Sequence, residues 1–98
     1  MDTEEARTLL RTELAGYRGK SYDNLVTLIK SHEHREIVGA SGTTYQLQIY
    51  AFWDAKPNDV LRVSAAIDDG GIRAYFPLTD DLLVAPSGEF VGEQPAAI

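Results

Sequence analysis

In two stretches of this chain every second side chain is apolar, and most of the side chains between them are polar. In the first, one face collects Tyr45, Leu47, Ile49, Ala51 and Trp53, and the other collects Gln46, Gln48, Tyr50 and Phe52. In the second, the apolar face collects Leu61, Val63, Ala65 and Ile67, and the other collects Arg62, Ser64, Ala66 and Asp68. Successive side chains of a β-strand point to opposite faces, so this period of two predicts two antiparallel strands that share one buried face.

Further strands are predicted on both sides of this pair. One covers about residues 35–40, and the Ser41-Gly42 pair after it marks a turn. A short last strand is predicted at 82–85, before the turn at Pro86-Ser87-Gly88.

The Asp69-Gly70 pair is typical of a two-residue hairpin turn, because such turns need positive φ angles. A hairpin centred there predicts a strand at 72–78. It pairs Ile67 with Ile72, Ala65 with Ala74, Val63 with Phe76 and Leu61 with Leu78. Apolar residues then face apolar residues throughout, which favours this register.

The first thirty residues carry helical patterns. Asp2 and Glu5 have the spacing of a capping box, and an apolar stripe follows at helical intervals, which predicts a helix over residues 3–16. Ser21 is a candidate N-cap for a second, shorter helix that ends near Lys30. Because the stripe and the apolar sheet face both need cover, we expect them to pack together.

The predicted fold class is therefore α+β, with two N-terminal helices packed on one face of a four- to five-stranded antiparallel β-meander. We expect a single domain over residues 1–93 and a frayed tail over residues 94–98.

Composition restricts the function classes. The chain has 98 residues, no cysteine and a formal net charge of -6. The acidic balance argues against nucleic-acid binding, and no apolar stretch approaches the length of a membrane span. Neither a secretory signal nor a disulfide framework is present, so we expect a soluble protein of the reducing cytoplasm.

The polar face of the predicted sheet is the best candidate for a binding site. We expect five of its residues to bind a protein partner or a second copy of the chain: Tyr50, Phe52, Arg62, Arg73 and Tyr75. Tyrosine and arginine are enriched where proteins meet. The aromatic rings would desolvate the centre of the contact, and the arginines would pair with carboxylates of the partner. A solvated face with cross-strand aromatic pairs is the simpler interpretation.

No catalytic residue, metal site or cofactor is predicted. His32-Glu33-His34 offers too few ligands for a closed metal site, and Asp68-Asp69 beside Gly70 is typical of a turn. The serines lack the context of a nucleophile elbow, and no glycine cluster precedes a helix as a phosphate loop does. We therefore expect a non-catalytic protein.

Two other functions remain open from the sequence. A ligand or enzyme pocket between helices and sheet would use Tyr17, Tyr22 and Tyr45 as its polar groups. Alternatively, an acidic domain of this size could act as an inhibitor or immunity-type protein that neutralises a basic partner.

Overall fold

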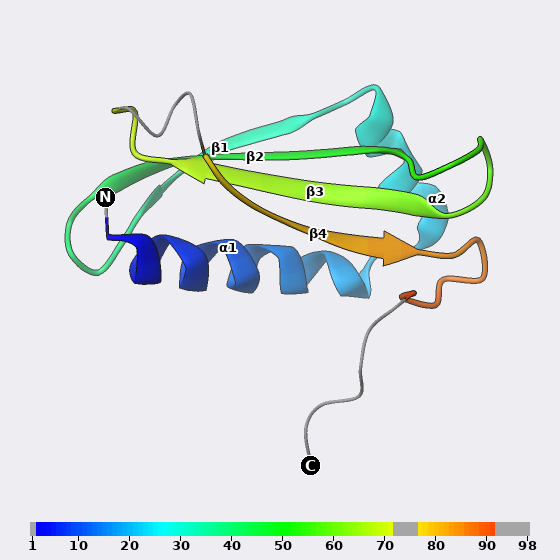
Figure 1. Ribbon diagram of the computed structural model, residues 1–98, viewed down its shortest axis with the longest axis horizontal. Coiled ribbons are helices and arrows are strands. Elements are labelled where there is room, and N and C mark those ends of the chain that lie inside the picture. Colours follow the sequence, from blue (N-terminus) through cyan, green and yellow to red (C-terminus); the bar gives the residue numbers. More distant parts are fainter. Residues whose placement is uncertain (1, 72–76, 92–98) are drawn as a thin grey trace, which may run out of the picture.

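The computed structural model describes residues 2–71 and 77–91 of the chain. Two helices lie at the N-terminal end and cover one face of an antiparallel sheet (Figure 1). Within the described residues the sheet has four strands in the order β1-β2-β3-β4, so each strand pairs with its neighbour in sequence. The predicted α+β meander is confirmed.

Both helices begin at the expected caps. Helix α1 spans Thr3–Gly16, and the Asp2 Oδ1 atom accepts a hydrogen bond of 3.1 Å from the Glu5 backbone N–H. Helix α2 spans Tyr22–Val26 and continues as a 3₁₀ turn over Thr27–Ile29. The Ser21 hydroxyl oxygen accepts a hydrogen bond of 3.1 Å from the Asn24 backbone N–H, as the N-cap preference of serine predicts.

The four strands are β1 (Glu33–Val38), β2 (Thr44–Trp53), β3 (Leu61–Asp68) and β4 (Leu78–Val84). The first strand begins and ends two residues earlier than the predicted range of 35–40. Alternation along the next two strands is as expected, since Ile49 and Val63 are fully buried while Tyr50 and Arg62 keep partial exposure.

The core lies between the helices and the inward face of the sheet. Helix α1 and the turn after it contribute Ala6, Leu10, Leu14 and Tyr17, and the second helical segment contributes Leu25 and Leu28. Inward side chains of β2, β3 and β4 close the other side of this cluster. Burial of apolar surface between the two layers is the main stabilising term, at roughly 25 cal/mol per Å2.

The predicted pairing of the third strand is wrong. Leu61 lies opposite Val84, and Leu78 lies opposite Ile67. Among the described residues, one strand, β4, spans Leu78–Val84, where the sequence predicted the end of one strand and a separate strand at 82–85. A shift of six residues keeps every side chain on its own face, so the apolar pattern alone could not exclude it.

Several sequence-based predictions lie outside the described residues. These are the strand residues Ile72, Ala74 and Phe76, the site residues Arg73 and Tyr75, and the tail at 94–98. Just before residue 92 the chain turns back onto the sheet: Phe90 bridges to Val84, and the Val91 backbone N–H donates to the Leu83 carbonyl at 2.8 Å.

Candidate functional site

The outer face of the sheet, away from the helices, carries an aromatic pair, of which Phe52 is exposed and Tyr50 partly exposed. Tyr50 and Phe52 project from β2 with their ring centroids 6.2 Å apart and their planes at 19°. The His32 ring lies 5.8 Å from the Tyr50 ring and extends the row. Phe52 is the next-to-last residue of β2, beyond the pairing with β1, and it is 44 % exposed.

Two small side chains lie beside this aromatic pair on β3. Ser64 is opposite Tyr50 and Ala66 is opposite Gln48. Both point to the outer face, yet they are only 6 % and 8 % exposed. Each lies between longer side chains on the neighbouring strands. The aromatic rings of β2 therefore project farther from the sheet than the side chains of Ser64 and Ala66.

Arg62 lies on the same face, but its charge is already compensated. Its Nε and Nη2 atoms donate to Asp54 Oδ1 at 3.0 and 2.7 Å, and its Nη1 atom donates to Asp81 Oδ2 at 2.6 Å. These contacts raise the pKa of Arg62, with Asp54 contributing most. Arg62 therefore joins the end of β2 to β4 across β3, a role that the sequence did not predict.

Three tyrosines considered as pocket residues use their hydroxyls inside the protein. The Tyr17 hydroxyl donates to the Glu33 carboxylate, and the Tyr22 hydroxyl donates to the Asp59 carbonyl at 2.5 Å. The Tyr45 hydroxyl donates to Glu5 Oε1 at 2.8 Å. All three bonds tie a helix or its following turn to the sheet layer.

Burial is the main cause of the altered ionisation of these tyrosines. It raises the pKa of Tyr17 to about 12, helped by the hydrogen bond to Glu33. The pKa of Tyr45 also rises to about 12, through burial and then the hydrogen bond to Glu5. A tyrosine with a raised pKa is a poor general base at neutral pH, so these groups act as structural donors.

The paired acidic residues serve local backbone geometry. Asp68 Oδ1 accepts from the Gly70 N–H at 2.8 Å, and Asp69 Oδ1 accepts from the Gly71 N–H at 3.2 Å, as expected of turn residues. Within residues 2–71 and 77–91, no three His, Cys, Asp or Glu side chains form a group able to hold a metal ion.

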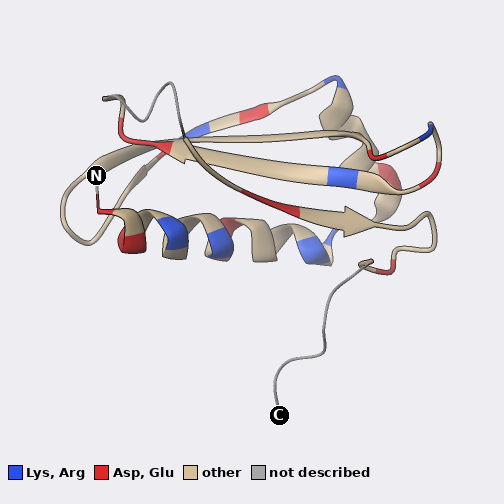
Figure 2. Cartoon of the chain, viewed as in Figure 1, with Lys and Arg blue, Asp and Glu red and all other residues tan. Residues whose placement is uncertain are grey.

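Charged residues are spread over both layers (Figure 2). Carboxylates occur in both helices, in three of the strands and in the loop after β2, and several of them are paired with Arg35 or Arg62. This distribution does not favour a single acidic surface of the kind that an inhibitor of a basic partner would use.

Comparison with known proteins gave no match: no family model, no curated protein and no solved structure is significantly similar to the chain. Among the described helices, none has both the length and the apolar character needed to cross a bilayer.

Proposed function

We propose that the chain is a non-catalytic protein-interaction module that self-associates through the outer face of its sheet. The observation that carries this proposal is the pair formed by the partly exposed Tyr50 and the exposed Phe52 on the outer face, in the second half of β2. Large aromatic side chains that remain in water on one partner and become buried in the complex are the usual energetic centres of protein interfaces.

Charge compensation on the same face supports a second copy as the partner. Two chains of net charge -6 repel each other at long range. On this face, however, the Arg62 guanidinium offsets one of the two carboxylates beside it, Asp54 and Asp81, which leaves a net charge of -1 per copy. The residue opposite Tyr50 is the small, uncharged Ser64. A two-fold contact would place the aromatic rows of both copies together, with less like-charge repulsion there than the net charge of the whole chain suggests. The cysteine-free composition suits the cytoplasm as the compartment.

The test is sedimentation equilibrium of the wild-type chain and of a Tyr50→Ala, Phe52→Ser double variant. We expect a reversible dimer whose dissociation constant rises on the order of tenfold or more in the variant. Circular dichroism should be unchanged, because both side chains lie outside the core.

Val38→Ser is the matched control. Val38 is 66 % exposed on the same face, but its partner Thr44 lies eight residues from Phe52 along β2, which is about 27 Å. We expect this variant to dimerise like the wild type. A wild-type chain that stays monomeric at the highest reachable concentration would refute self-association.

A further inference from the structure

A trough runs between helix α1 and strand β4, on the side of the sheet opposite to the aromatic pair. It consists of two neighbouring hollows of about 170 and 280 Å3 that share the side chains of Arg11 and Asp80. We name it the α1–β4 trough. Its lining comprises Arg7, Leu10, Arg11, Leu14, Ala15, Arg18, Leu78, Thr79, Asp80 and Leu82.

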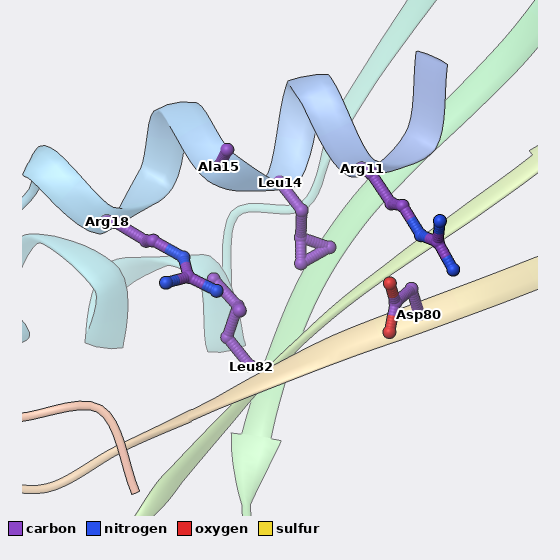
Figure 3. A pocket seen from close by; sticks show the side chains of 6 residues that line it. All are labelled: Arg11, Leu14, Ala15, Arg18, Asp80 and Leu82. Atoms are coloured by element: carbon purple, nitrogen blue, oxygen red, sulfur yellow. The ribbon is translucent and has the colours of Figure 1, made fainter. Parts of the chain in front are cut away.

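The helix and the strand run side by side along this trough. Arg7 shares a hollow with Leu78 and Thr79, whereas Arg18 shares the other hollow with Leu82, so the two elements point the same way. Leucines form the floor, and Figure 3 shows the Arg11 and Arg18 guanidinium groups projecting from the helix into the space before β4. Asp80 projects from the strand toward Arg11.

Three arginines line the trough although the chain as a whole is acidic. Arg35 is paired with Glu13 at 2.7 Å and Arg62 with two aspartates, while Arg18 lies over the Phe90 ring at 5.6 Å. Within the described part of the chain, Arg7 and Arg11 have no carboxylate within ion-pair distance. Among the residues that the structure describes, Asp80 is the one carboxylate that lines the trough, so the guanidinium groups of Arg7 and Arg11 face a single negative charge there.

Strand β4 is also the last strand of the sheet. Apart from the Phe90–Val84 bridge and the Val91–Leu83 hydrogen bond at its C-terminal end, no described strand pairs with the outer edge of β4. The Leu83 carbonyl points away from β3 to receive Val91, and backbone groups alternate along an antiparallel strand, so those of Asp81 and Thr79 also point outward. The Asp81 N–H is covered by Asp80 Oδ1 at 2.9 Å.

We propose that the α1–β4 trough binds an extended acidic segment of a partner protein, laid along the free edge of β4 with carboxylates on alternate residues toward Arg7 and Arg11. The spacing fits this ligand. Residues four apart on a helix rise about 6 Å along its axis, and alternate side chains of an extended chain are about 6.6 Å apart. The segment would gain backbone hydrogen bonds from the strand edge and charge-assisted bonds from the arginines.

Asp80 controls access to this surface. A charged side chain that points inward from an edge strand blocks casual pairing with other strands. Here the Asp80 carboxylate repels an incoming acidic residue and also occupies the Asp81 N–H. A ligand must therefore offer at least two well-spaced carboxylates, so that their attraction to the arginines exceeds the repulsion from Asp80. This requirement makes binding in the trough selective.

Calorimetric titration with a synthetic peptide tests the proposal. The probe has about six to eight residues, with glutamate at alternate positions and valine or threonine between them. We expect Arg7→Gln and Arg11→Gln each to weaken binding about fivefold. Asp80→Asn should tighten binding, because the amide oxygen still caps the Asp81 N–H while the negative charge is gone.

Two controls distinguish specific binding in the trough from nonspecific attraction between opposite charges. Lys56→Gln removes one positive charge from an exposed loop outside the trough and should leave the affinity unchanged. An isomeric peptide with its glutamates contiguous should bind more weakly. The Tyr50→Ala, Phe52→Ser variant should bind the peptide normally, so failure of the trough and failure of the dimer are distinguishable.

Several results would overturn the proposal. They are unchanged affinity in the Arg7→Gln, Arg11→Gln double variant, an equal loss in Lys56→Gln, or full displacement of the peptide by inorganic phosphate at equal concentration. The last result would reveal a simple anion site without recognition of an extended chain. A chain ending at Val91 should bind the peptide at least as tightly as the full chain; weaker binding would also contradict the trough as the site.

Discussion

Glu5 shows how one side chain can serve a purpose other than the one its sequence position suggests. In a capping box its carboxylate would turn back to the helix N-terminus. Instead it accepts hydrogen bonds from the Ser41 N–H at 3.0 Å, the Ser41 hydroxyl at 2.6 Å and the Tyr45 hydroxyl at 2.8 Å. These bonds tie the first turn of α1 to the loop between β1 and β2.

This arrangement requires a glycine at position 39. A Cβ atom there would lie 2.3 Å from Glu5 Oε1 and 3.0 Å from the Tyr45 ring. We expect Gly39→Ala to push the carboxylate from its three donors and to destabilise the fold by about 1–3 kcal/mol, as overpacked sites usually do. Urea unfolding measures the change.

A double-mutant cycle with Glu5→Ala isolates the cause. If the clash with Glu5 is responsible, Gly39→Ala should cost much less once Glu5 is absent. Gly16→Ala is the control, because a Cβ there meets nothing within 4 Å and alanine favours a helix. An equal penalty for Gly39→Ala in both backgrounds would contradict this explanation.

At the level of elements, the register between β3 and β4 is the feature that could not be predicted from the sequence. The Asp69-Gly70 pair suggested an immediate hairpin, but β4 begins only at Leu78. In the observed register Ala66 lies opposite Thr79, and neither residue exchanges backbone hydrogen bonds with the other, so their Cα atoms are expected about 4.5 Å apart.

Engineered cysteines can test this register, since the chain has none of its own. Ala66→Cys with Thr79→Cys should form a disulfide under mild oxidation, because the expected Cα separation lies within the range that a disulfide spans. Ala66→Cys with Asp81→Cys, displaced by two residues, should stay reduced. Thiol titration distinguishes the two, and the opposite result would place β4 in another register.

The elements that the sequence predicted well are those with a strong local signal. Helix α1 had both a cap and a stripe, and β2 and β3 had long alternation. Strand β4 has Thr79, Asp80 and Asp81 in its middle, which weakens its apolar pattern, and only packing against Leu10 and Leu14 of α1 identifies its inward face.

In the candidate sites, too, some features follow from local sequence patterns and others only from tertiary packing. Alternation placed Tyr50 and Phe52 on the outer face, but the ion pairs of Arg62 depend on the β4 register and on the loop after β2. The i, i+4 spacing of Arg7 and Arg11 is visible in the sequence, whereas their position beside an open strand edge follows only from how α1 packs.

At the scale of the whole molecule, the polar bonds between the layers predict how stability changes with pH. Hydrogen bonds from Ser41 and then Tyr45 lower the pKa of Glu5 below its ordinary value of 4.5. Its contribution is therefore present above pH 4.5 and is lost as the pH falls through the lower folded-state value. Comparing the acid unfolding of the wild type and Glu5→Gln tests this, because the variant should lose less stability over that range.

At alkaline pH, folding stability is expected to fall as the pH rises. Tyr17 and Tyr45 have folded-state pKa values of about 12 against 10.0 for the free side chain. Their contribution is complete below pH 10 and is lost as the pH rises from 10 through 12. Tyr17→Phe and Tyr45→Phe should each flatten this decline in thermal-melting measurements. A decline that both variants leave unchanged would show that other groups are responsible.

The meander order has a consequence for synthesis on the ribosome. Helix α1 leaves the exit tunnel before the strands do, but it packs mainly on β3 and β4, and β4 ends only at Val84. The leucine side chains of α1 therefore remain exposed to solvent until β3 and β4 have been synthesised and paired. In that interval the nascent chain is most accessible to chaperones and most prone to aggregation. Substitutions that slow the pairing of β4 with β3 should therefore lower the yield of folded protein.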